Sequence, residues 1–142
     1  MGAAGAVGCL VRIVCSYCSA AKRDDEGPLP ALERYRSERL RDLARQAGGG
    51  GAPLFILSGR FGLLAPDEPI PWYDHLLSAD EAPAMAHRVA RRLRELGVTE
   101  VEYHTAAAAA VAPVRPYLAT MRAACAEAGA ALTIVELAGD PA

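Results

Sequence analysis

The sequence lacks any long apolar run, and this argues against a membrane-spanning helix. Its longest apolar stretches are roughly ten residues, whereas a helix needs about 20 to cross a bilayer. Residues 1–14 lack the basic segment that opens a secretory signal peptide, and they fit a buried strand better. We therefore expect a cytoplasmic protein that does not bind membranes and whose cysteines stay reduced.

The sequence also lacks an excess of basic residues. Its 15 Lys and Arg residues are outnumbered by 17 Asp and Glu residues, which gives a formal net charge of −2. Proteins that hold duplex nucleic acid usually carry a clear basic excess. The balance disfavours tight, non-specific binding to nucleic acid, although it leaves room for a local basic face.

Cysteine is scarce, with four residues in 142, and this argues against a structural zinc site. Cys15 and Cys18 form one Cys-x-x-Cys pair, but such a site usually needs a second pair, and Cys9 and Cys125 are too far apart to form it. A redox pair normally opens a helix, which is not the pattern here. We expect buried structural thiols, no metal and no cofactor, with a thiol redox protein as a weaker alternative.

What the sequence does contain is an alternation of apolar strands and amphipathic helices. Strands are predicted over residues 8–15, 53–57, 98–105 and 131–137. Helices are predicted over residues 31–48, 79–97 and 106–129, the last interrupted by Pro113 and Pro116. The glycines of residues 48–51 are expected to end the first helix, and a capping box at Ser78 and Glu81 to begin the second.

This alternation favours parallel strands joined by right-handed crossovers. We predict one α/β domain over residues 1–142, a three-layer sandwich whose four-stranded, mostly parallel sheet has helices on both faces. The Ala-rich third helix fits either the core or the face of a homodimer.

Two long loops, residues 15–30 and 58–75, follow strands at the edge of the sheet where open α/β folds bind ligands. Loops of this length inside a compact domain are usually functional. Ser58, Gly59, Arg60 and Gly62 begin the second loop, where a glycine-rich turn directs backbone N–H groups at an anion or a carbonyl oxygen. The alternative is a simple tight turn; the spacing matches neither a dinucleotide fingerprint nor a Walker loop.

Further along this loop, prolines stiffen a segment that carries Tyr73 and Asp74. An aromatic ring beside a carboxylate suits a planar base and a sugar hydroxyl. The alternative is that Trp72 and Tyr73 fill the rim of the core while Asp74 caps the next turn.

The first loop and the third strand add further candidates. Cys15, Ser16 and Lys22 offer polar atoms and a cation for a phosphate or a carboxylate, or they are solvated. His104 ends the third strand, as an acid–base group or as a hydrogen-bonded rim residue. Most of the arginines at positions 34, 36 and 39 are expected to be solvated.

The chain resembles a little-characterised bacterial and phage family over roughly residues 10–100. The motif is Leu-Ser-Gly-x-x-Gly-Leu-Leu, followed by Pro, Ile and Tyr-Asp, which here are Leu57 to Leu64, Pro66, Ile70, Tyr73 and Asp74. An earlier Cys-Ser with a nearby Lys corresponds to Cys15, Ser16 and Lys22. The motif is similar to that of the peroxide-stress protein YaaA, and more loosely to a catalytic domain of archaeosine synthase.

The resemblance implies a layout like that of uracil-DNA glycosylases and a nucleobase, nucleotide or nucleic-acid ligand. We expect a hydrolase that cleaves or exchanges an N-glycosidic bond of a small nucleotide. Asp74, Lys22 and Ser58 are the catalytic candidates, and the ligand-binding candidates are Cys15, Ser16, Gly59, Arg60, Gly62, Tyr73 and His104. The alternative is a non-catalytic module that binds nucleotides or nucleic acid in stress or phage defence.

Overall fold

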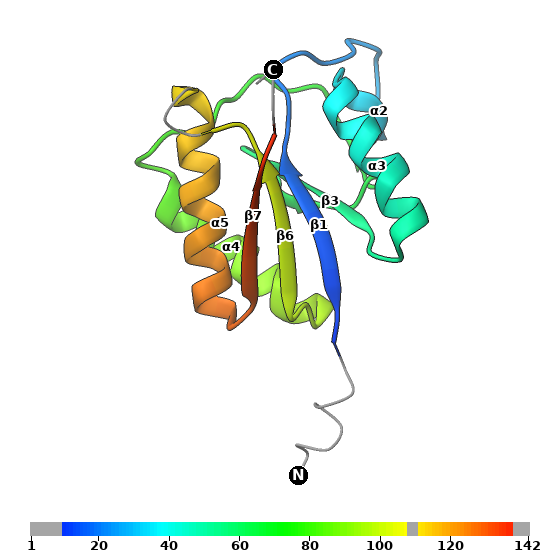
Figure 1. Ribbon diagram of the computed structural model, residues 1–142. Helices are drawn as coiled ribbons and strands as arrows, with labels where there is room; N and C mark the ends of the chain where they lie inside the picture. Colours follow the sequence, from blue (N-terminus) through cyan, green and yellow to red (C-terminus); the bar gives the residue numbers. More distant parts are fainter. Residues whose placement is uncertain (1–9, 108–110, 138–142) are drawn as a thin grey trace.

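The computed structural model describes residues 10–107 and 111–137, and its centre is a five-stranded sheet with the order β4-β3-β1-β6-β7 (Figure 1). Four strands run parallel, namely β1 (Arg12–Tyr17), β3 (Leu54–Ser58), β6 (Glu100–Thr105) and β7 (Ala131–Glu136). The mixed α/β class and the mostly parallel sheet are therefore confirmed.

The predicted four-stranded sheet has five strands. Residues after Ser58 turn back through Gly62, whose φ is +78°, and form the short strand β4 (Gly62–Leu64) antiparallel to β3. Three buried residues are too few for an apolar pattern to reveal a strand, and positive φ is the conformation that glycine adopts without strain. Part of the predicted loop therefore belongs to the sheet.

Helices lie on both sides of the sheet, consistent with a three-layer sandwich. Helix α3 (Glu38–Gly50) lies on one side of the strands, and α4 (Ala82–Leu96) and α5 (Arg115–Ala128) lie on the other (Figure 1). Side chains alternate accordingly along β6, where Val101, Tyr103 and Thr105 are buried and Glu102 and His104 are half-buried. None of the helices in these described ranges is both long and apolar enough to cross a bilayer.

The first predicted helix is two helices. Helix α2 (Ala31–Arg34) ends because Tyr35 is extended, and α3 begins after Ser37, whose hydroxyl accepts a hydrogen bond from the Leu40 N–H at 3.2 Å. Helix α3 continues through the glycines and ends only at Gly51, with φ +83°. The N-cap serine marks the start of α3, and the helix extends through the exposed glycines although glycine has a weak helix propensity.

The later helices follow the prediction more closely. Ser78 and Glu81 form the expected capping box: the Ser78 N–H donates to the Glu81 carboxylate at 2.9 Å, and the Glu81 N–H donates to the Ser78 hydroxyl at 3.3 Å. Helix α4 itself begins at Ala82. A 3-10 turn, η1 (Ala112–Val114), precedes α5, as the two prolines indicate. Residues 108–110 of the predicted third helix, and the chain after Leu137, lie outside the described residues.

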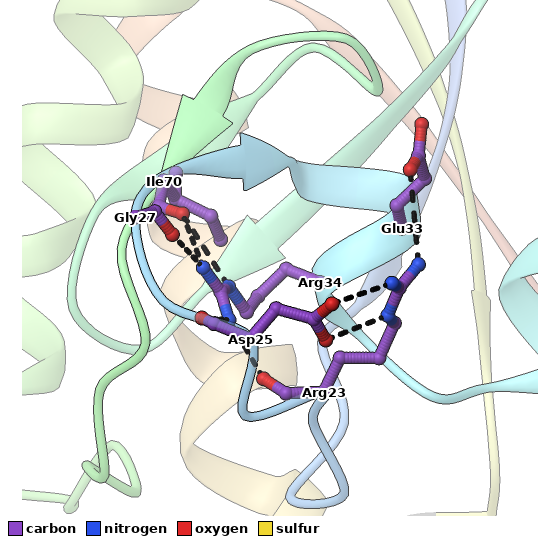
Figure 2. Close-up of polar contacts among 6 residues, drawn as sticks. All are labelled: Arg23, Asp25, Gly27, Glu33, Arg34 and Ile70. Atoms are coloured by element: carbon purple, nitrogen blue, oxygen red, sulfur yellow. Dashed lines mark hydrogen bonds and ion pairs between the residues drawn. The ribbon is translucent and has the colours of Figure 1, made fainter.

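The two long loops are joined to each other. Strand β2 (Leu29–Pro30) pairs antiparallel with β5 (Pro69–Ile70) in a small second sheet. Beside it, Arg34 is fully buried, and its guanidinium donates to four backbone carbonyls, those of Arg23, Asp25, Gly27 and Ile70, at 2.5–3.4 Å (Figure 2). Arg34 is therefore an exception to the expectation that most of these arginines are solvated, because its guanidinium donates to backbone carbonyls of the loop and of β5.

Candidate functional site

A cavity of about 420 Å³ opens at the carboxyl end of β1, and we call it the β1 cavity. The first long loop and the start of α3 form one wall of the cavity. The segment before α4 forms another wall, and the start of α5 completes the lining. Its lining residues are Tyr17, Cys18, Ser19, Ala20, Ala21, Lys22, Arg36, Arg39, Asp74, His75, Leu76, Val111, Pro113, Val114 and Tyr117. It lies at the edge of the sheet where the fold predicts a ligand.

Three cations line this cavity, namely Lys22, Arg36 and Arg39. The ion pairs among the described residues involve other basic side chains, and none of them includes these three. Positive charge without a carboxylate partner at a concave surface favours an anionic ligand.

Arg39 is fixed by the end of β1. Its guanidinium donates to Ser16 Oγ at 2.7 Å, to the Tyr17 carbonyl at 2.8 Å and to the Cys18 carbonyl at 3.1 Å, and it lies 3.8 Å from the centre of the Tyr17 ring. Burial lowers the pKa of Arg39. Ser16 is itself fully buried and donates to the His104 carbonyl at 2.6 Å. The Ser16 hydroxyl therefore links Arg39 to the end of β6.

Lys22 is held over an aromatic pair. Its ammonium lies 4.5 Å from the centre of the Tyr73 ring and 5.9 Å from that of Tyr35. The Tyr73 hydroxyl makes hydrogen bonds to Tyr35 at 2.5 Å and to Ser58 at 3.0 Å, and burial raises the pKa of both phenols. The two phenols therefore stay neutral and form a platform for the lysine.

Asp74 and His75 complete the polar lining. Asp74 is exposed and makes no hydrogen bond or ion pair within the described ranges. His75 Nε2 lies 2.9 Å from a carboxylate oxygen of Glu81. The backbone N–H of Ser78 is the main cause that lowers the pKa of Glu81, which keeps this carboxylate charged beside the imidazole.

Comparison with known proteins places this architecture in a family. The model of a family of unknown function, DUF6884, matches residues 13–137, a span that contains every residue of the β1 cavity. The chain belongs to DUF6884. No curated protein and no solved structure matches it.

In this DUF6884 protein the glycine-rich turn lies apart from the β1 cavity. Ser58 is fully buried, and its Oγ accepts from the N–H groups of Arg60 and Phe61 at 3.1 and 3.0 Å. Gly59 and Arg60 line a second, more open hollow of about 490 Å³, and Gly62 packs under the side chain of Arg88. The structure therefore gives Ser58 a role in closing the turn, and His75 is the residue that lines both hollows.

Two other predicted residues also lie away from the β1 cavity. Cys15 is fully buried, and burial raises its pKa well above the usual range of a thiol, which disfavours the thiolate that redox chemistry needs. The His104 side chain lies in a third hollow beside Glu102, with 3.5 Å between Nε2 and Oε2. Lys22 and Asp74 are the two predicted catalytic residues that the structure brings to one cavity.

The sequence reasoning missed Arg36, Arg39 and Tyr117 as cavity residues. The available signal was Ser37, because an N-cap there starts α3 at the rim of the sheet and places Arg36 just before the N-cap and Arg39 on the first turn. Tyr117 follows two prolines, and nothing local indicates that its ring returns to the end of β1, 6.2 Å from the Tyr17 ring.

Gly59 is required by the packing of Tyr117. A Cβ atom at Gly59 would lie 2.6 Å from Tyr117 Oη and 3.0 Å from the Leu77 nitrogen, which itself donates to Tyr117 Oη at 3.2 Å. We expect Gly59→Ala to lower the free energy of unfolding by about 1–3 kcal/mol, because backbone on one side and a buried ring on the other resist displacement. Urea denaturation measures this.

A matched glycine gives the control. A Cβ atom at Gly48, inside α3, meets no atom within 4 Å, so Gly48→Ala should stabilise the protein by up to about 1 kcal/mol through helix propensity. Adding Tyr117→Phe to Gly59→Ala should recover part of the loss, since the closest contact is then removed. Equal stability of Gly59→Ala and the native protein would contradict the packing described here.

Proposed function

We propose that the chain is an enzyme that binds a phosphorylated nucleobase compound in the β1 cavity and cleaves or exchanges its N-glycosidic bond. The observation that supports this most is that one cavity is lined by three cations without ion pairs and by one carboxylate, Asp74, without a partner, as far as residues 10–107 and 111–137 are concerned. Opposite charges that line the same cavity without pairing are the arrangement expected when a ligand bears both an anionic group and a centre that becomes positive.

Each polar residue has a role in this proposal. Lys22 and Arg36 neutralise the phosphate, and Arg39, held by Ser16, adds positive charge at the floor. Asp74 stabilises the positive charge that develops on the sugar when the glycosidic bond breaks, and it orients the attacking water. Tyr17 and Tyr117 line the cavity as buried rings, and Arg39 covers a face of Tyr17 as Lys22 covers a face of Tyr73, so the base is not assigned a stacking partner inside the cavity.

The finer relationships belong to this proposal as well. The motif that begins at Leu57 resembles that of YaaA and of an archaeosine synthase domain, and a mostly parallel sheet between helices is compatible with a layout like that of uracil-DNA glycosylases. A cytoplasmic location and a small nucleotide substrate are the parts of the proposal that follow from composition.

The direct test is to incubate the protein with a panel of nucleoside monophosphates and nucleosides and to measure released base by chromatography. Binding is measured in parallel by calorimetry. We expect Lys22→Gln and Arg36→Gln each to weaken nucleotide binding about tenfold or more, because each removes a charge-assisted contact to phosphate. Binding of the nucleosides should change little.

Arg45→Gln is the matched control for the loss of one positive charge. Arg45 lies on the exposed side of α3 and pairs with Asp42. If Lys22→Gln, Arg36→Gln and Arg45→Gln bind nucleotides equally well, the cavity does not hold phosphate and the proposal fails.

The second candidate is a binding module without catalysis. It is favoured by the interior position of Ser58 and by the hydrogen bonds that engage Tyr73, which remove a hydroxyl nucleophile and a free phenol from the cavity. This candidate predicts nucleotide binding with no release of base from any compound of the panel.

A further inference from the structure

Trp72, the single tryptophan of the sequence, is exposed beside the proposed site. Its side chain is 54% exposed, and it makes no ring contact with the described residues. Leu76 in the same segment is 59% exposed, so two of the five exposed large apolar side chains of the described chain lie within five positions of each other. Exposed aromatic and apolar groups this close together are typical of a binding surface.

Trp72 belongs to the segment that forms one wall of the β1 cavity. Tyr73 and Leu77 are buried and His75 is half-buried, whereas Trp72, Asp74 and Leu76 are exposed. Asp74 and Leu76 line the cavity, and Trp72 lies two positions before Asp74. Two residues span at most about 7 Å, so the backbone of Trp72 lies within roughly the length of one nucleotide of Asp74.

The opposite wall has the complementary chemistry. Lys22 and Arg36 come from the first long loop and from the residue before the N-cap of α3, and neither has a carboxylate partner in the part of the chain described. One wall is therefore basic, and the other carries Asp74 between two exposed apolar side chains, Trp72 and Leu76. A single nucleic-acid strand has this same division, with phosphates along one side and base faces available on the other.

We infer that the ligand of the β1 cavity is a nucleotide within a single-stranded nucleic acid, and that Trp72 stacks on the neighbouring base outside the cavity. This rests on the proposed binding of a nucleotide in the cavity. The net charge of −2 is compatible with it, because the contact needs a local basic wall and not a basic protein. Duplex is disfavoured, since paired bases cannot reach both the cavity and the indole.

The test compares a mononucleotide with a longer ligand. Binding of a 5′-monophosphate, of a labelled six-nucleotide single strand in DNA and RNA forms, and of the corresponding duplex is measured by calorimetry and fluorescence anisotropy. We expect the single strand to bind at least tenfold more tightly than the monophosphate. Trp72→Ala should weaken the single strand about 5- to 150-fold, the range for loss of one base–aromatic stack, and change the monophosphate less than about twofold.

Trp72→Phe should restore most of the affinity, because it restores an aromatic face. Leu96→Ala removes an exposed apolar side chain at the far end of α4 and should have no effect. Intrinsic fluorescence gives a second readout, since Trp72 emission should be quenched by the single strand and not by the monophosphate.

The outcomes separate this inference from the proposed function. If the monophosphate binds but the single strand binds no better, or if Trp72→Ala weakens both ligands equally, the inference is overturned while the nucleotide site stands. If the duplex binds as tightly as the single strand, the inference is also overturned. If no ligand binds, both fail together.

Discussion

Replacing Arg34 with methionine is expected to lower the free energy of unfolding by about 3–5 kcal/mol. Methionine keeps most of the apolar volume of the arginine stem but removes every donor from the guanidinium. Four carbonyl oxygens, of Arg23, Asp25, Gly27 and Ile70, then lose this donor, the bonds to Ile70 being buried and the other three partly buried (Figure 2). An unsatisfied buried carbonyl costs about 1–3 kcal/mol, and entry of water offsets part of the sum.

The effect of Arg34→Met should also extend to the residues that line the β1 cavity. The carbonyls that Arg34 holds belong to the first long loop and to β5, so the guanidinium fixes Lys22 and its neighbours relative to the segment that carries Asp74. We expect amide hydrogen exchange over residues 18–30 to rise in Arg34→Met, beyond the change that global destabilisation explains. Ligand binding should weaken in proportion.

Two further variants show whether this reasoning holds. Arg34→Lys keeps the charge but has three donors on one nitrogen, so it should recover less than half of the loss. Arg45→Met removes an exposed, paired arginine of α3 and should change stability by less than about 1 kcal/mol. A loss of similar size in Arg34→Met and Arg45→Met would contradict the anchoring role. Denaturation in urea, with the slope compared among variants, measures all three.

Arg34 also illustrates which parts of this fold are legible in the sequence. The parallel strands are encoded by short runs such as residues 53–57, where nearly every side chain is apolar, and that signal is local. The burial of Arg34 is not local, because it depends on carbonyls up to 36 positions away on β5. Arg34, Arg36 and Arg39 have similar sequence contexts, so the sequence does not indicate which of the three arginines is buried in the fold.

The candidate site divides in the same way. Lys22 and Asp74 were predictable because loops after parallel strands converge at one edge of a sheet. Ser58 and Tyr73 lie close to that edge, but their side chains point inward and bond to each other. Whether the side chain of a loop residue points inward or outward depends on tertiary packing. The positions of Arg36 and Arg39 in the cavity lining also depend on tertiary packing.

Asp74 carries the largest expected effect on activity. We expect Asp74→Asn to reduce the rate of base release about 10²- to 10⁴-fold, the usual range for loss of a positioned acid–base or electrostatic group. Asparagine has the same shape and is neutral at every pH of the assay, so the change isolates the charge. Because Asp74 is exposed and has no partner among the described residues, the fold should tolerate the replacement.

The measurement separates chemistry from binding. The turnover number should fall while the dissociation constant of the nucleotide changes by no more than a few fold, since the proposed function assigns the phosphate to Lys22 and Arg36 on the other wall. Asp67→Asn, an exposed acidic position of the same loop, controls for the loss of one negative charge. Full turnover in Asp74→Asn would remove the carboxylate from the mechanism, and binding without turnover in the native protein would favour the binding module. The charge on Asp74 therefore decides between the two functions that the cavity allows.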